Sequence, residues 1–392
     1  MNYLDRSNVI KDEIVENRRF LHQNPEVGME LPNTVDFITS KLTEMGYKPI
    51  KMGPAGVLAT VGNGNGKTFL LRADMDALPM DEECDLEFAS KNGAFHGCGH
   101  DMHAAMLLGA AKLLKENESN INGTIKLMFQ PGEEVFKGAI SMIDAGVLEN
   151  PKVDASFAIH VAAGNVPVGL YMYNNSSPMM CSADMFKIKI KGFGAHGSYP
   201  NASIDPINIC THTVIALEEI IARETNPALQ CVLTIGSIHA GSAPNIIPET
   251  AEIQGSIRSN DNEMRELMVN RLKEIAENTA KTFRGSATVE ILSGTPVLFC
   301  DKDTTDKMVE YINELPMGTK YPMPNLQANA SEDYAEITSR VPSTYIMIGA
   351  GFPTIANAPS NHNPNVMFNE DALSIGAAML AHCSTRWLEE HR

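Results

Sequence analysis

The chain has 392 residues, and its 48 aspartates and glutamates outnumber 31 lysines and arginines, which gives a formal net charge of −17. This acidic balance argues against nucleic acid and anionic membrane surfaces as partners, because both attract basic proteins. The length predicts two domains, with enough residues to bury a sizeable core.

Cysteine usage and the absence of long apolar runs predict a cytoplasmic protein. The seven cysteines are odd in number and scattered, which favours reduced thiols over a disulfide framework. The first residues lead into a charged helix rather than an apolar signal segment, and no apolar run is long enough to span a bilayer. We therefore expect no membrane partner.

The first part of the chain alternates helices with short apolar strands. Helical spacing of apolar residues predicts helices over 7–23 and 34–45, and aliphatic runs predict strands over 57–61 and 68–71. Residues 72–79 follow the second strand directly and contain two aspartates. Open α/β sheets place their chemistry at such strand ends, so these acids are candidates for a site.

Residues 95–103, Phe-His-Gly-Cys-Gly-His-Asp-Met-His, concentrate three imidazoles, a thiol and a carboxylate. The following segment, 104–114, is rich in strong helix formers, which places the cluster on a loop at the start of a buried helix. Cys98 and His100 are two residues apart, and thiolate with imidazole favours zinc or a similar cation. A loop with a buried thiol and surface histidines is the simpler alternative.

Two further strands end in groups that can bind a metal. Glu133 and Glu134 follow a strand over 123–130, and one of them could bind metal while the other moves protons. Alternatively, both acids could mark the start of a helix, where the helix dipole favours negative charge. His160 ends a strand over 153–160, a position where a hydrogen-bonded core histidine is also common.

The middle of the chain changes from an α/β to an α+β pattern. Residues 184–192 alternate apolar and basic side chains, which is typical of a half-exposed antiparallel strand. The expected order strand-helix-strand-strand-helix-strand is the ferredoxin-like βαββαβ pattern. The remaining elements of this part are a helix over 205–224, strands over 230–240 and 249–259, a helix over 262–283 and a strand over 287–292.

These patterns predict a discontinuous α/β domain with a mostly parallel sheet over 1–181 and 296–392. A ferredoxin-like α+β domain over 182–295 is inserted into it. In the last part we expect a strand over 343–349 and a closing helix over 370–388.

Four motifs in this order resemble the M20 metallopeptidase family: residues 72–79, 96–103, 129–134 and 331–334. The likeness is to the amidohydrolase branch with a cysteine ligand, which includes aminoacylases, hippurate hydrolases and auxin-conjugate hydrolases. It extends over essentially the whole chain, including the inserted domain, and it implies that the α/β catalytic domain has a phosphorylase/hydrolase-like fold.

The resemblance implies two divalent cations and a general base. The cation ligands would be Cys98, His100, Glu134, His160 and His362. Their mixed sulfur, nitrogen and oxygen donors suit zinc, manganese, cobalt or nickel. Glu133 would take a proton from the attacking water and return it to the leaving amine. The implied substrate is an N-acyl amino acid or a short peptide-like molecule.

The resemblance also implies that the inserted domain is a lid that joins two chains into a homodimer. His196 would reach the active site of the partner chain and stabilise the developing oxyanion there, whereas Asn245 and Arg258 would bind substrate. Pairing of open sheet edges would produce the two-fold dimer. A surface histidine on a glycine-rich loop and a charge on a solvated strand face are the alternatives for His196 and Arg258.

Two aspartates and two departures from the family pattern complete the candidates. Asp76 and Asp101 lie in the motifs, and we expect both to orient ligands rather than to bind metal. The chain departs from the pattern at 161–164 and at Asn201, and we expect both departures to affect the acyl pocket more than the metals.

Other functions fit some of these residues. A purely structural zinc site is possible, but such sites usually have closely spaced ligands. A thiol enzyme would use Cys98 as nucleophile with His100 or His103 as base. Within metal hydrolases, the alternatives are a carboxypeptidase or dipeptidase and a deacetylase of the N-acetyl-diaminopimelate type.

Overall fold

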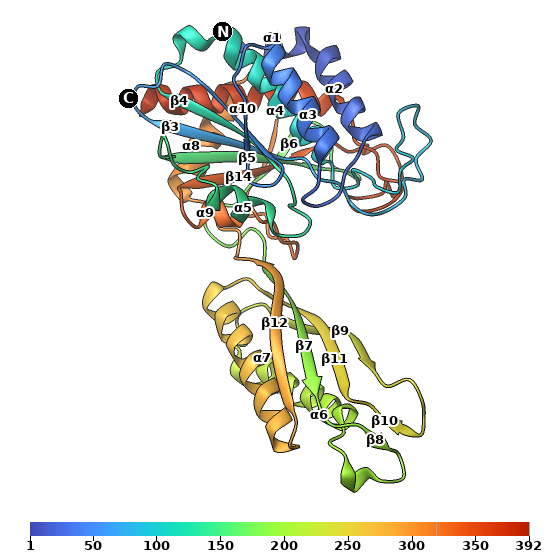
Figure 1. Cartoon of the computed structure of the whole chain (residues 1–392). Helices are drawn as coiled ribbons and strands as arrows, with labels where there is room; N and C mark the ends of the chain where they lie inside the picture. Colours follow the sequence, from blue (N-terminus) through green and yellow to red (C-terminus); the bar gives the residue numbers. More distant parts are fainter. Residues whose placement is uncertain (319, 392) are drawn as a thin grey trace. The chain divides into compact units, whose positions relative to one another are not determined.

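The computed structural model describes residues 1–318 and 320–391. The chain divides into two compact units (Figure 1). The first unit comprises Met1–Met179, Phe299–Gln327 and Asp333–Arg392, and the second comprises Met180–Leu298 and Ala328–Glu332. Among the described residues, no helix combines the length and the apolar character that crossing a membrane requires.

An eight-stranded sheet with the order β1-β2-β4-β3-β5-β14-β6-β13 forms the centre of the first unit. Its middle strands β4, β3, β5 and β14 are parallel, whereas β1 and β2 pair antiparallel at one edge. The prediction of a large, mostly parallel sheet is therefore confirmed. The strands are β1 (Ile50–Met52), β2 (Gly56–Val61), β3 (Thr68–Asp74), β4 (Thr124–Gln130), β5 (Ala155–Ala162), β6 (Leu170–Met172), β13 (Tyr321–Met323) and β14 (Ser343–Gly349).

Helices flank this sheet, and one of them is buried on all sides. Helix α4 packs against α2, α10, β3 and β5, and its apolar side chains continue around its circumference, as expected for a helix inside a core. The helices of the first unit are α1 (Tyr3–Val9), α2 (Lys11–Gln23), α3 (Pro32–Glu44), α4 (His100–Glu116), the 3₁₀ turn Glu118–Asn120, α5 (Gly138–Asp144), α8 (Lys302–Glu314), α9 (Ala335–Thr338) and α10 (Asp371–Glu390).

Three element boundaries in the first unit differ from the sequence prediction. The helix expected over 7–23 is two helices that meet at Ile10, whose backbone N–H bonds to carbonyls of the preceding turn. Strand β3 continues to Asp74, because its parallel pairing with β4 extends to Gln130. Strand β5 continues beyond His160, because β14 pairs with it as far as Ala162. Asp74 is therefore a strand residue rather than a loop residue, and His160 lies within its strand rather than at the last position.

The second unit has a four-stranded antiparallel sheet with the order β12-β7-β11-β9. Helices α6 and α7 contribute to a single apolar core with Phe186, Ile188 and Ile253 from the strands. The elements are β7 (Ser182–Lys191), β8 (Ala195–His196), the 3₁₀ turn Pro200–Ala202, α6 (Pro206–Glu219), the π-helical turn Ile220–Glu224, β9 (Cys231–Ala240), β10 (Ile246–Ile247), β11 (Thr250–Ser259), α7 (Asn262–Thr282) and β12 (Ser286–Thr295).

The two ends of this second sheet carry different features. At one end, Ser182 is paired with Ser259, close to residues 180 and 298, where the main segment of the second unit begins and ends. Beyond the other end, β8 and β10 form a separate two-stranded ribbon in which His196 is paired with Ile246. His196 and Arg258 therefore lie at opposite ends of the second unit.

Candidate metal centre

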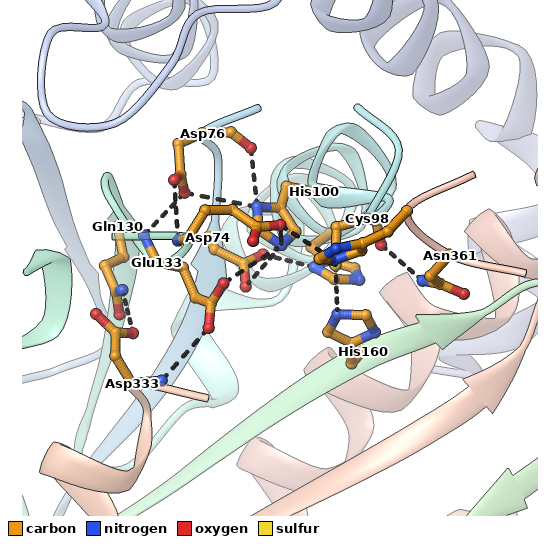
Figure 2. Close-up of polar contacts among 12 residues, drawn as sticks. Asp74, Asp76, Cys98, His100, Gln130, Glu133, His160, Asp333 and Asn361 are labelled. Atoms are coloured by element: carbon orange, nitrogen blue, oxygen red, sulfur yellow. Dashed lines mark hydrogen bonds and ion pairs between the residues drawn. The ribbon is translucent and has the colours of Figure 1, made fainter. Parts of the chain in front are cut away.

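Most of the predicted ligands converge at the carboxyl ends of strands in the first unit. Asp76 follows β3, Glu133 and Glu134 follow β4, and His160 lies near the end of β5. The carboxyl ends of parallel strands meet at one edge of a sheet, where open α/β folds bind ligands. Figure 2 shows Asp76, Glu133 and His160 around Cys98 and His100.

Five predicted ligands lie within a few ångströms of each other. The Cys98 Sγ atom is 3.4 Å from Nε2 of His160 and 3.2 Å from Nε2 of His362. Glu134 Oε1 is 3.5 Å from His362 Nε2 and 3.9 Å from His100 Nε2. Overlapping groups of these side chains have the spacing that a bound cation requires.

Two of the histidines are oriented for metal binding by backbone carbonyls. His100 Nδ1 lies 2.8 Å from the carbonyl oxygen of Asp76, and His160 Nδ1 lies 2.8 Å from that of Val161. A carbonyl can only accept, so each Nδ1 carries a proton and Nε2 is the ring atom that faces the cluster. In the neutral imidazole, this arrangement is the tautomer that a metal ligand needs.

Unpartnered buried atoms show that a cation fits this cluster. His100 Nε2 and Glu134 Oε1 are both buried, and neither has a hydrogen-bond partner among the described residues. Burial raises the pKa of Cys98 and also that of Glu134. Buried acceptors and a buried thiolate are costly without a compensating positive charge, and a divalent cation supplies that charge.

Glu133 lies beside the cluster, on a loop that is held in place by hydrogen bonds to Asp76. Its backbone N–H donates to Asp76 Oδ1 at 3.0 Å, and that of Glu134 donates to Asp76 Oδ2 at 3.2 Å. The Glu133 carboxylate is 4.0 Å from His100 Nε2 and accepts from the backbone N–H of Asp333 at 3.4 Å. Neither acid begins a helix, since α5 starts only at Gly138. Asp76 thus connects the loop of both acids to His100.

A buried charged network under the cluster was not predicted from the sequence. Arg72 donates to Asp74 at 2.7 Å, to Gln130 at 2.9 Å and to Asp333 at 3.1 Å. Asp74 also binds His103 Nδ1, and His103 Nε2 accepts from the backbone N–H of Val161 at 2.9 Å. In the sequence, the sign of this network is the pair of polar residues at alternate positions at the end of the apolar strand β3, Arg72 and Asp74.

Burial and the charges of this network together set the pKa values of Asp74 and His160. Burial opposes the charged form of Asp74, but Arg72 and the neighbouring histidines outweigh it and lower the pKa of this carboxyl. Burial, together with His103, lowers the pKa of His160, which keeps its imidazole neutral. A neutral imidazole is the form that binds a metal.

Asp101 lies in a different environment from the one expected. Its carboxylate accepts from Arg18 at 2.7 Å and lies 2.8 Å from His22 Nδ1, instead of contacting a candidate ligand. Successive helix residues are rotated by roughly 100°, so Asp101 points away from the face that carries His100 and His103. The expectation that Asp101 orients a ligand is therefore corrected: it joins α2 to α4.

The candidate residues of the second unit do not form one cluster. His196 is exposed, and its neighbour Gly197 donates a backbone hydrogen bond to Asn245 O at 2.8 Å. Arg258 is half-buried at the other end of the sheet, where it donates to Ser331 Oγ at 2.7 Å. Within this unit, Asn245 accompanies His196 and not Arg258.

Comparison with known proteins identifies the family. The sequence pattern described as peptidase family M20/M25/M40 matches residues 70–386. The chain belongs to this family. The predicted M20 membership is thereby confirmed, and it makes the chain a hydrolase.

Several relatives are similar over nearly their whole length. Thermostable carboxypeptidase 2 of Saccharolobus solfataricus is 36% identical, with 95% of this chain and 94% of the relative covered. N-acetyl-L-cysteine deacetylase of Bacillus subtilis is 34% identical, with 97% and 90% covered. The solved YXEP protein of Bacillus subtilis, a dinuclear metal-binding peptidase of the M20 family, has a TM-score of 0.79 and 28% identity, with 97% of this chain and 99% of that chain covered.

Proposed function

We propose that the chain is a metal-dependent amidohydrolase that cleaves the amide bond of N-acyl amino acids. The observation that carries this proposal is the Glu133 carboxylate, 4.0 Å from His100 Nε2, beside a cluster of metal-competent groups in which His100 Nε2 and Glu134 Oε1 have no hydrogen-bond partner among the described residues. A carboxylate next to a cation site is what hydrolysis by an activated water requires.

In this proposal the cluster holds two divalent cations, of zinc, manganese, cobalt or nickel. The ligands would be Cys98, His100, Glu134, His160 and His362. When bound, such cations polarise a water and the amide carbonyl. Glu133 accepts the proton of the water on its carboxylate and delivers it to the leaving nitrogen, while Asp76 holds its loop in place.

The second unit is proposed to be a ferredoxin-like lid that also forms a homodimer. Its strand order β12-β7-β11-β9 and its two helices on one face support this assignment. The proposed domains are 1–181 with 296–392 for catalysis and 182–295 for the lid. Strands β12 and β9 are the edges of the four-stranded sheet and can pair with a second chain.

Three lid residues have proposed roles in this dimer. His196 would donate to the oxyanion in the partner chain, and Asn245 would bind substrate near it. Arg258 would bind a substrate carboxylate. The exposed position of His196 at the end of its unit supports a role toward another chain.

All seven cysteines are free thiols, which supports a cytoplasmic location.

The preferred substrate distinguishes the proposed function from a carboxypeptidase or dipeptidase. We expect N-acetyl and N-benzoyl amino acids to be hydrolysed with a kcat/KM at least about tenfold higher than dipeptides with a free amine, because burying an unpaired ammonium is costly. Release of free amino acid from matched acyl and dipeptide substrates measures this ratio. A clear preference for the dipeptides would favour the peptidase.

The thiol-enzyme alternative is tested by Cys98→Ser. Burial raises the pKa of Cys98, so without a metal this thiol is a poor nucleophile. We expect the variant to bind metal at least about tenfold more weakly and to recover part of its activity when the cation is in excess, because serine is a weaker ligand. Activity should be measured over a series of metal concentrations. If no concentration restores activity while metal binds normally, Cys98 is a nucleophile.

A further inference from the structure

Asn361 lies at the junction of three chain segments that carry candidate ligands. Its side chain makes a hydrogen bond to the loop before α4 (Figure 2) and two further hydrogen bonds to the end of β5, and Asn361 directly precedes His362. We propose that Asn361 is a positioning residue that fixes the relative placement of Cys98, His160 and His362. This inference rests on the proposed metal site.

The hydrogen bonds of Asn361 all go to backbone atoms of these segments. Nδ2 donates to the carbonyl oxygen of Cys98 at 2.9 Å and to that of Val161 at 3.1 Å, and Oδ1 accepts from the N–H of Ala163 at 3.0 Å. These contacts also fix the orientation of the amide. A flipped amide would place its oxygen against two carbonyl oxygens and its NH₂ group against an N–H.

One of these bonds reaches the group that orients a ligand. The Val161 carbonyl that accepts from Asn361 also accepts from His160 Nδ1 at 2.8 Å. The hydrogen bond from His160 Nδ1 to this carbonyl keeps the proton on Nδ1 and leaves the His160 Nε2 lone pair toward Cys98. Asn361 therefore holds both the strand end and the acceptor on which the His160 tautomer depends.

His362 needs such support, because its own surroundings constrain it weakly. Its side chain is 53% exposed, and its backbone has a positive φ of 67°, which is unusual for a residue other than glycine. The backbone N–H of His362 donates to Gly97 O at 2.8 Å, beside the bond from Asn361 to Cys98. Residues 361 and 362 thus pair with residues 97 and 98, which brings His362 Nε2 to Cys98 Sγ.

The loop offers a matched control at Asn365. Its Nδ2 donates to Glu83 Oε2 at 2.9 Å, so it connects the same loop to another segment without contacting the ligand segments. Replacing Asn365 by alanine removes one exposed hydrogen bond to a carboxylate side chain from the same loop. An effect specific to Asn361 therefore separates ligand placement from general loosening of the loop.

The test compares metal binding by the full-length wild type, Asn361→Leu, Asn361→Ala and Asn365→Ala. Dissociation constants for Zn²⁺ are measured by competition with a chelator, and cobalt-loaded protein reports the thiolate contact through its sulfur-to-cobalt charge-transfer absorption. Of the two proposed zinc ions, we expect the more weakly bound one to have a dissociation constant about 10–100-fold higher in both Asn361 variants than in wild type. This is the usual effect of losing a group that supports a ligand. The charge-transfer absorption should weaken or shift, whereas Asn365→Ala should stay within about twofold of wild type.

The outcomes separate this inference from the proposed function. If wild type binds zinc and both Asn361 variants retain its affinity and its cobalt spectrum, Asn361 does not position the ligands, even if both variants melt at lower temperature. An equal loss of affinity in Asn365→Ala would also overturn the inference. If wild type itself binds no zinc, cobalt or manganese, the metal site fails and the inference fails with it. Should Asn361→Leu not fold, Asn361→Ala alone decides.

Discussion

Replacing Glu133 by glutamine is expected to lower kcat for an N-acyl amino acid by about 10²–10⁴, the usual contribution of a positioned general base. Glutamine keeps the size of the side chain and can still accept from the N–H of Asp333, but it cannot take a proton from water. Metal content should remain at the wild-type value, because Glu133 is not a proposed ligand. Steady-state kinetics with excess cation, together with elemental analysis, measures both quantities.

Glu134→Gln is the matched control for this variant. The two acids are adjacent, and their loop is held by backbone N–H groups that bind Asp76, so neither side-chain substitution removes these bonds. Glu134 Oε1 lies among the proposed ligands, so its loss should lower metal content as well as rate. If Glu133→Gln loses the metal and Glu134→Gln keeps it, the roles of the two acids are exchanged.

His196→Ala is expected to lower kcat by about 10²–10³, the typical loss when one oxyanion donor is removed. His196 is exposed at the end of the second unit and is remote from Arg258 within that unit. Metal content and dimerisation should remain unchanged, because His196 is neither a proposed metal ligand nor part of the edge strands β12 and β9. Kinetics, elemental analysis and size-exclusion chromatography of the variant test these three expectations.

Mixed dimers decide whether His196 acts on its own chain or on the partner. When His196→Ala and Glu133→Gln chains are combined, action in trans gives each mixed dimer one site with both lesions and one intact site. Activity should then recover to about half of normal per mixed dimer, although each variant alone is nearly inactive. If sizing shows that subunits have exchanged and no activity returns, His196 does not act in trans.

Local sequence pattern was enough to select Cys98 and His100 as a candidate metal-binding pair, because they lie two residues apart at the start of a buried helix. It left the roles of Glu133 and Glu134 open, and the full set of candidate ligands came from the resemblance to the M20 family. The network of Arg72, Asp74 and Asp333 was not predicted, since it depends on which strands are adjacent and on the length of β3. Such packing is a tertiary property that periodicity does not reveal.

The sequence assigned Asp101 a role that its contacts do not support, and it gave no indication of Asn361. The two cases have related explanations. Asp101 follows the proposed ligand His100 in sequence, but helix rotation directs its side chain to Arg18 and His22. Asn361 precedes a ligand on an irregular loop, where no periodicity indicates the direction of a side chain. Its three backbone partners lie about 200 residues or more away in the chain, so only the folded structure brings them together.

Metal titration of the chelator-treated chain tests the central claim most directly. Protein freed of metal should hydrolyse N-acyl amino acids at about 1% of the wild-type rate or less, because a positioned metal ion supplies several kcal/mol of transition-state stabilisation. Adding Zn²⁺, Mn²⁺, Co²⁺ or Ni²⁺ should restore activity and reach a plateau near two ions per chain. Full hydrolytic activity in protein shown by elemental analysis to contain no metal would contradict the account.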